Sequence, residues 1–334
     1  GLALCLVLIF GGLKVLRGEM PVSNLVAFQL YLAHLDWPMM AFGWFIQLYR
    51  AGKASEGRIE SFVSKESELQ RLPELKRLPY DPHFDFRVEN VGVHFGDTQR
   101  PLFENMNFQI SSKSWTGIAG PVGSGKTVLL ELLSRQRDPS KGSIFYRGEN
   151  LKTKLPSEIA EDILYVPQET FLFSRSVRRN LLLGTTEKIE DDLLTELMGD
   201  LRLDTEAFRH RGSLDARLGE RGVNMSGGQK QRLSLGRALL RKREVYLLDD
   251  LFSHVDSETE TKLIDVLKRK LKSNSTVVLV SQRLETLKQC SHIIVFDESG
   301  FEMAGPTGEI LQKSKFLLRL AKIQAELQGE SKWA

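Results

Sequence analysis

The sequence has few cysteines and no large excess of charge of either sign. Its two cysteines, Cys5 in an apolar run and Cys290 far downstream, argue against a disulfide framework. No cluster of histidine and cysteine has the spacing of metal ligands. The 46 Lys and Arg residues nearly balance 43 Asp and Glu residues, so we expect no nucleic acid partner. Any anionic ligand must therefore be held locally.

The N-terminal part of the chain is apolar over two stretches. The chain begins without Met inside the first, residues 2–12, which has neither the basic start nor the cleavage site of a secretory signal, so we expect a cut membrane helix. Residues 24–49 form the second, long enough at about 1.5 Å per residue to cross a hydrocarbon core of about 30 Å, although His34 and Asp36 lie inside it. A soluble core helix seldom stays this apolar for so long. The pattern predicts a helical hairpin in a lipid bilayer.

The remaining residues suggest the domain boundaries. The 334 residues exceed the usual size of one domain, so we expect two units. Residues 1–64 are predicted to be transmembrane helices with a cytosolic extension, and 65–82 to be a linker rich in Glu, Arg and Pro. Alternating strands and helices follow over 83–327, and 328–334 form a tail. Basic residues after position 49 predict that the second unit lies in the cytoplasm. We expect an integral protein of the plasma or inner membrane.

A glycine-rich loop lies between a predicted strand, 115–119, and a predicted helix. Glycines in such a loop let several backbone N–H groups point at one anion, at the positive end of the helix dipole. A lysine at its end can reach the β and γ phosphates, and the next hydroxyl can bind Mg²⁺. The loop consists of Gly120, Pro121, Val122, Gly123, Ser124, Gly125, Lys126 and Thr127. It predicts an α/β P-loop domain that binds a nucleotide together with Mg²⁺.

Two carboxylates follow a second apolar strand, residues 244–248. At the carboxyl edge of a parallel sheet, this strand would deliver Asp249 beside the phosphate loop, where it can hold Mg²⁺ directly or through water. Taken alone, Asp249 and Asp250 would as often be a solvated turn. The phosphate loop upstream favours the metal-binding interpretation.

A third motif, Asn-Met-Ser-Gly-Gly-Gln-Lys-Gln-Arg at 224–232, resembles the signature of the ATP-binding cassette (ABC) transporter family, with Met225 where Leu is usual. The resemblance covers residues 1–327 and is to exporters that fuse transmembrane helices to the cassette. It implies a mixed sheet with a helical subdomain, and a head-to-tail dimer in which the signature closes on the partner's ATP. The residues involved would be Ser226, Gly227, Gly228 and Gln229.

The resemblance implies further roles. Phe95 lies where an aromatic residue stacks on adenine, although an ordinary strand residue is equally expected there. Gln168 corresponds to the glutamine that senses Mg²⁺ and contacts the membrane domain. Residues 253–256 resemble the loop that links two nucleotide sites, and residues 308–327 an amphipathic helix without assigned chemistry.

Two catalytic positions depart from the family pattern. Asp250 stands where Glu usually polarises the attacking water, and Gln282 where a histidine usually bridges to the γ phosphate. Asp is one methylene shorter, and Gln has no cationic form. Asp250 and Gln282 together predict a site that binds ATP but hydrolyses it slowly, as in the degenerate subunit of heterodimeric exporters, while Gln168, the third catalytic candidate, matches the family pattern. The partner would be a different exporter half with intact Glu and His.

Three functions compete at this point. An exporter of an unidentified substrate is the first, with a slight preference for amphipathic or lipid-like cargo. A regulatory subunit that holds ATP as a clamp and gates its partner is the second. A soluble DNA-repair ATPase is disfavoured because residues 1–49 would be exposed to water and no long coiled-coil insertion separates the motifs.

Overall fold

The computed structural model describes residues 2–64, 69, 71–72, 75, 77–94, 101–185, 187–203, 213–271 and 274–330. The chain divides into two compact units, Gly1–Glu68 and Leu69–Ala334.

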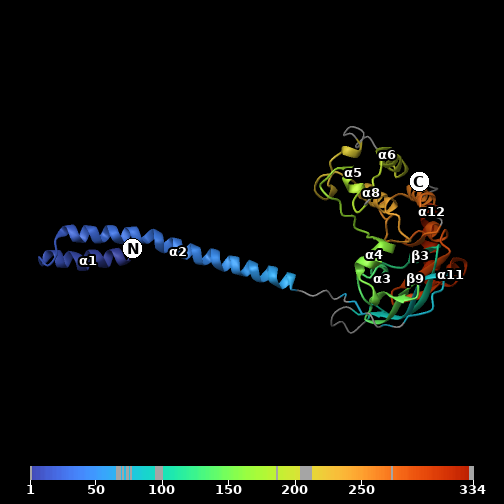
Figure 1. Cartoon of the computed structure of the whole chain (residues 1–334), viewed down its shortest axis with the longest axis horizontal. Coiled ribbons are helices and arrows are strands. Elements are labelled where there is room, and N and C mark those ends of the chain that lie inside the picture. The colour runs from blue at the N-terminus through green and yellow to red at the C-terminus, as the bar shows by residue number, and fades with distance from the viewer. Residues whose placement is uncertain are drawn as a thin grey trace. The chain divides into compact units, whose positions relative to one another are not determined.

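The first unit is a helical hairpin (Figure 1). Helix α1 covers Leu2–Leu16 and α2 covers Val22–Val63. Gly18 adopts a φ of 72° in the turn, a conformation open to glycine. Two helices with a short break were predicted, and both are present. The second helix also continues past residue 49, where an extension up to residue 64 was predicted.

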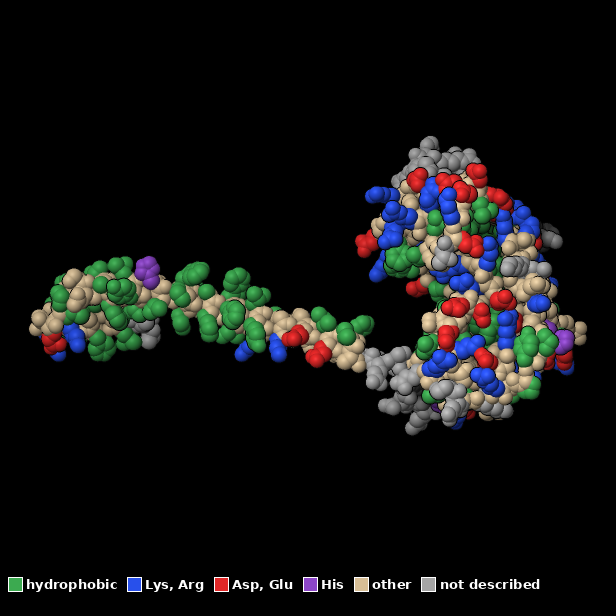
Figure 2. Space-filling view, viewed as in Figure 1, with side chains coloured by type: hydrophobic (Ala, Val, Ile, Leu, Met, Phe, Trp, Pro, Cys, Tyr) green, Lys and Arg blue, Asp and Glu red, His purple; other side chains and the backbone are tan. Residues whose placement is uncertain are grey.

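The hairpin exposes most of its large apolar side chains. No described residue of α2 is buried, and Phe10, Trp37 and Trp44 are 64%, 73% and 71% exposed. Figure 2 shows hydrophobic side chains over most of this unit. Among the residues that the structure describes, no helix combines the length and the apolar character needed to cross a membrane. The prediction that residues 24–49 form such a helix is therefore not met.

The second unit contains two sheets. One is antiparallel in the order β2-β1-β4-β5, and the other is mixed in the order β10-β9-β3-β8-β7-β6, with β10 alone antiparallel to its neighbour. The mixed sheet was predicted. The strands are β1 (Phe84–Val93), β2 (Phe103–Ser111), β3 (Trp115–Ala119), β4 (Lys141–Tyr146), β5 (Glu149–Asn150), β6 (Ile163–Val166), β7 (Val245–Leu248), β8 (Thr276–Val280), β9 (His292–Asp297) and β10 (Gly300–Pro306).

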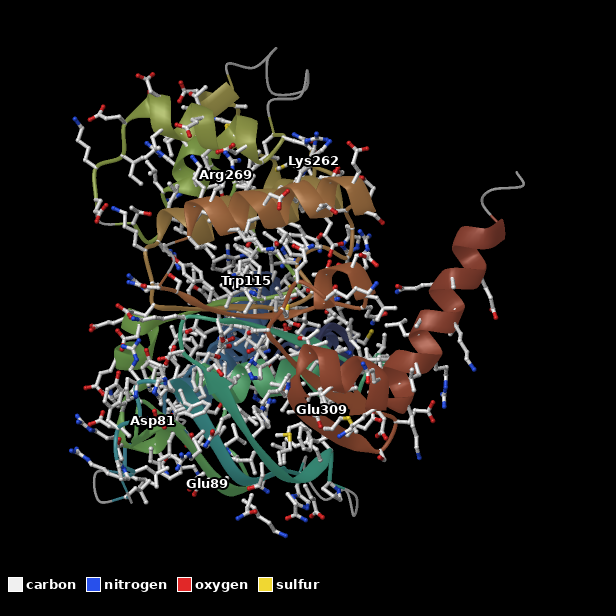
Figure 3. All side chains as sticks on the ribbon, turned by 90° about the vertical axis from the view of Figure 1, so that its right-hand side faces the viewer. Asp81, Glu89, Trp115, Lys262, Arg269 and Glu309 are labelled. Carbon is white, nitrogen blue, oxygen red and sulfur yellow. The ribbon has the colours of Figure 1, made fainter. Side chains whose placement is uncertain are left out.

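Helices cover the mixed sheet, and α5, α6 and α8 form a separate lobe (Figure 1). This lobe is the predicted helical subdomain. The helices are α3 (Lys126–Leu133), α4 (Pro156–Asp162), α5 (Val177–Leu181), α6 (Asp191–Asp200), α8 (Gly227–Leu240), α9 (Ser257–Lys270), α10 (Leu284–Leu287), α11 (Thr307–Lys313) and α12 (Lys315–Glu330), with 3₁₀ turns at Leu151–Thr153, Ser213–Asp215 and Glu220–Gly222. Figure 3 shows α9, marked by Lys262 and Arg269, beside the strand end at Trp115, and Lys268 Nζ lies 5.7 Å from the Trp115 ring centroid.

Strand β1 changes its buried face midway. Phe86 and Val88 are buried in its first half, and Val91 and Val93 in its second. This shift from even to odd positions coincides with a register break between Val88 and Val91, where Asn90 has a φ of 51°. A β-bulge of this kind adds one residue and keeps apolar side chains on the same face of the sheet.

Packing of the mixed sheet determines the location of the candidate site. Strands β3, β8, β7 and β6 are parallel neighbours, so their carboxyl ends lie at one edge. Their side chains are buried in two apolar clusters, one between the two sheets and one extending into the helical lobe. The loops that follow these strands are therefore brought together on a rigid base.

Candidate functional site

The carboxyl edge of the mixed sheet carries a cavity of about 320 Å³. The loops after β3, β6, β7 and β8 all contribute to its wall, as parallel strand order requires. Predicted site residues that line it are Val122, Gly123, Gly125, Lys126, Thr127, Gln168, Asp249, Asp250 and Gln282. Three further lining residues, Leu102, Val128 and Val280, are apolar and were not predicted.

The phosphate loop has the backbone shape that glycine permits. Gly125 precedes α3 with a φ of 97°, and a Cβ atom there would lie 2.8 Å from the Phe103 ring. Gly123 has a φ of 81° with open space around it. Both positions are left-handed, which L side chains rarely adopt. The loop therefore places backbone N–H groups close together at the start of α3.

Two polar groups of the loop suit an anionic ligand. The Lys126 ammonium donates hydrogen bonds to the carbonyl oxygens of Gly120 at 2.9 Å and Pro121 at 2.6 Å, so it is folded over the loop. The buried Ser124 hydroxyl has no hydrogen-bond partner among the described residues. A buried polar group of this kind calls for a ligand or water. These residues fit a phosphate group.

Asp249 is a buried carboxylate at the end of β7. It is 2% exposed, and its Oδ2 atom accepts a hydrogen bond from the Tyr165 hydroxyl at 3.2 Å. Burial raises the pKa of Asp249, and hydrogen bonds from the side chains of Thr127 and Tyr165 oppose that rise. A buried carboxylate beside a threonine hydroxyl is a donor set that fits Mg²⁺.

Asp250 lies next to Asp249 in a different environment. Its backbone has a φ of 43°, and its Oδ2 atom accepts a hydrogen bond from the Gln168 amide at 3.1 Å. Burial raises the pKa of Asp250, and the positive charge of Lys126 opposes the rise. Burial conversely lowers the pKa of Lys126, and the two carboxylates oppose that effect. The cavity thus brings the two carboxylates and the ammonium into mutual interaction.

The signature residues begin α8 in the helical subdomain. Ser226 is the N-cap, and its hydroxyl accepts a hydrogen bond from the Gln229 N–H at 3.3 Å. The Gln229 side chain accepts one from the Ser226 N–H at 3.0 Å, which completes a capping box. Among the described residues that line the cavity, none comes from Ser226, Gly227, Gly228 or Gln229. The signature is therefore formed, but apart from this cavity.

A buried glutamine joins α8 to the loop after Asp250. Gln231 is 3% exposed, and its amide nitrogen donates to Ser253 Oγ at 2.9 Å. Its carbonyl oxygen accepts from the His254 N–H at 3.2 Å. Ser253 Oγ in turn donates to the backbone oxygen of Asp250 at 3.0 Å. Hydrogen bonds thus run from the signature helix to the cavity wall.

Phe95, predicted to stack on adenine, lies outside the described residues. Tyr165 was not predicted to belong to the site. Its position on a strand three residues before Gln168 was the available signal, because side chains near the carboxyl end of a parallel strand lie close to the site.

The fold and this cavity define a P-loop nucleotide-binding domain. Residues 103–253 match the family model described as ABC transporter. The chain is 31% identical over 304 residues to the Bacillus subtilis protein described as probable multidrug resistance ABC transporter ATP-binding/permease protein YheI, covering 90% of this chain and 51% of that protein. It is 33% identical over 339 residues to the Escherichia coli multidrug resistance-like ATP-binding protein MdlA, covering 98% and 55%.

A solved structure has the same fold. It is described as a bacterial Atm1-family ABC exporter with ATP bound, and it matches with a TM-score of 0.72 at 23% identity, covering 92% of this chain and 53% of that one. The chain thus spans about half the length of the relatives it matches.

Proposed function

We propose that this chain is the ATP-binding part of an exporter, which couples ATP binding and hydrolysis to the movement of a substrate across a membrane. The observation that carries the proposal is that Lys126, Thr127 and Asp249 line one cavity at the carboxyl edge of the mixed sheet. The names of its relatives, which describe ATP-binding and permease proteins, support the same function.

Each part of the cavity has a proposed role in holding Mg-ATP. Lys126 moves from the carbonyl oxygens of its own loop to the β and γ phosphates, and Ser124 donates its unpartnered hydroxyl. Thr127, Gln168 and Asp249 would hold Mg²⁺, which when bound neutralises phosphate charge. The remaining loop positions, from Gly120 to Gly125, contribute backbone N–H groups, and Phe95 is proposed to stack on adenine.

Binding of Mg-ATP to purified protein tests this part of the proposal. Isothermal titration calorimetry should detect saturable binding that depends on Mg²⁺. Lys126→Ala removes the ammonium and should weaken binding at least about tenfold, since each charge-assisted hydrogen bond contributes about 1.5–3 kcal/mol. Lys322→Ala, an exposed position on α12, is the control. Absence of any binding by the unmodified protein would refute the proposal.

The chemical step at this site is proposed to be slow. Asp250 would have to polarise the attacking water, yet its short side chain accepts a hydrogen bond from Gln168. Gln282 can donate a neutral hydrogen bond to the terminal phosphate but cannot add positive charge there. The resulting subunit would retain ATP for long periods. Asp250, Gln282 and Gln168 are the proposed catalytic set.

A second exporter half is the proposed partner. The start of α8, from Ser226 to Gln229, lies apart from this chain's own cavity. This separation supports a role of these residues on the nucleotide of another subunit. A different subunit with intact Glu and His would complete a fast site with this signature. Purified homodimer and co-purified candidate pairs should be compared for phosphate release, and rapid turnover by the homodimer alone would count against the pairing.

The hairpin is proposed to belong to the membrane region of the exporter, with residues 65–82 as the linker to a cytoplasmic domain over 83–327 and a tail at 328–334. Its exposed aromatic residues Trp37 and Trp44 would be unfavourable in water and suit contact with lipid. Membrane fractionation provides the test. Recovery of the protein in the soluble fraction without detergent would oppose membrane localisation.

A further inference from the structure

The side chain of Gln324, on the C-terminal helix α12, bonds to the backbone of the loop that carries Gln282. Its amide nitrogen donates to the Gln282 carbonyl oxygen at 2.9 Å. Its amide oxygen accepts from the Leu284 N–H at 3.4 Å. Both ends of one amide group are thus used on two backbone groups that flank Arg283, about 40 residues earlier in the chain.

The bond to Leu284 replaces a helix cap that the local sequence lacks. Helix α10 begins at Leu284 and its N-cap is Arg283, which makes no side-chain capping hydrogen bond. The first N–H groups of a helix have no partner within the helix, and Ser, Thr, Asp or Asn at the N-cap usually accepts from one of them. Arginine has no acceptor atom for this purpose. Gln324 supplies the acceptor from another helix.

The neighbours of Gln282 are anchored elsewhere in the unit. The Ser281 N–H donates to the Ile118 carbonyl oxygen of β3 at 3.1 Å. Arg283 pairs with the buried carboxylate of Glu260 on α9, with 2.6 Å between Nη1 and Oε2. Together with Gln324, these contacts fix the backbone on each side of Gln282, which lines the candidate cavity. The position of Gln282 therefore depends on three elements, one of them α12.

Helix α12 is held well enough to act as such an anchor. Its residue Leu317 is 1% exposed and belongs to the apolar cluster that includes Leu284 and Leu287 of α10. Ser314, just before the helix, accepts from the Leu317 N–H at 3.2 Å. In Figure 3 the helix starts near α11, marked by Glu309, and its last turns extend outward from the unit. The first turn of α12 is thus fixed by packing and hydrogen bonding, and Gln324 lies further along the same helix.

We propose that Gln324 is a positioning residue, through which α12 holds Gln282 at the wall of the nucleotide cavity. This inference rests on the proposed function for the nature of the ligand. If the cavity binds ATP as proposed, Gln282 at its wall would contact the terminal phosphate, so its position would matter for ATP and not for ADP. Movement of α12 away from α10 would release the loop that carries Gln282. The difference between the affinities for ATP and ADP would then become smaller.

Replacement of Gln324 tests the inference in the whole protein. Gln324→Ala removes both hydrogen bonds while placing the best helix-forming residue in α12, so the helix is preserved. Amide exchange followed by mass spectrometry should become several-fold faster at residues 284–287, because the Leu284 N–H loses its acceptor. The affinity for ATP should fall about three- to tenfold with ADP affinity unchanged. Lys322→Ala, on the same helix, should alter neither measurement.

A second variant separates the two hydrogen bonds. Gln324→Glu keeps an oxygen acceptor for Leu284 but loses the amide donor to Gln282, so exchange at residues 284–287 should stay slow while the ratio of ATP to ADP affinity still falls. Unchanged exchange in Gln324→Ala overturns the inference whether or not nucleotide binds. Failure of the unmodified protein to bind ATP, with faster exchange in Gln324→Ala, would instead refute only the proposed function and its nucleotide consequence.

Discussion

Replacing Asp250 by Glu and Gln282 by His should make the candidate site hydrolyse ATP faster, because the two changes restore the groups whose absence is proposed to slow it. The additional methylene in Glu moves the carboxylate outward by about 1.5 Å. Misplacement of a catalytic group by about 1 Å can cost about a hundredfold in rate, so this change alone should increase turnover about ten- to a hundredfold. Histidine adds a group that can carry positive charge toward the terminal phosphate.

The structure also predicts a cost of the Glu replacement. Asp250 has a φ of 43°, in the left-handed region that Asp tolerates better than Glu. We expect Asp250→Glu to lower the free energy of unfolding by about 1 kcal/mol. The hydrogen bond from Gln168 Nε2, 3.1 Å long in the Asp protein, must also re-form at a new place. A gain at the lower end of the range would reflect these two effects.

Phosphate release from saturating Mg-ATP by the purified subunit is the appropriate assay. The unmodified protein, both single variants and the double variant should be compared, with thermal unfolding measured in parallel. Lys126→Ala in the double variant sets the background, since it removes the proposed phosphate contact. The reasoning is refuted if the unmodified protein already matches the double variant, or if a folded double variant that binds ATP is no faster.

Three further predictions address the loop, the carboxylate and the link to the signature helix. Gly125→Ala should destabilise the protein by about 2–4 kcal/mol, because its Cβ would collide with the Phe103 ring, whereas Gly123→Ala should cost about 1–2 kcal/mol from backbone strain alone; urea unfolding compares them. Asp249→Asn should raise the unfolding midpoint without Mg²⁺ and nucleotide, and since burial raises the pKa of Asp249, the gain should shrink as pH falls and the native carboxyl becomes protonated. Gln231→Leu should cost about 1–3 kcal/mol in calorimetric unfolding, because it leaves the buried bonds to the loop after Asp250 unmade; no loss would contradict the assigned contacts.

Much of the nucleotide site could be predicted because its residues are contiguous motifs at strand ends. A glycine-rich loop between strand and helix, and two carboxylates after a buried strand, each imply their surroundings. Parallel strand order then brings Lys126, Gln168 and Asp249 into one cavity. Strand β1 was not predicted in detail, because its buried positions change from even to odd and only the bulge at Asn90 makes the two halves one strand.

Contacts between distant parts of the chain could not be predicted in the same way. Gln324 lies on a helix whose amphipathic pattern predicts packing but not which polar side chain faces α10. Tyr165 looked like an ordinary strand residue until the fold placed its hydroxyl beside Asp249. The helix over residues 24–49 was expected to cross a membrane because of its length and apolar character, but no described helix combines the two to the degree that a membrane span needs.

The link through Gln231 restricts how the helical lobe can move. Rotation of α8 must either take Ser253 and His254 with it or break the hydrogen bonds that Gln231 makes to both. Ser253 is bonded to the Asp250 backbone, so the first alternative would also displace the carboxylate at the cavity. A tilt of the lobe and a shift of the carboxylate are thus mechanically coupled within one subunit, without any change in the strands beneath.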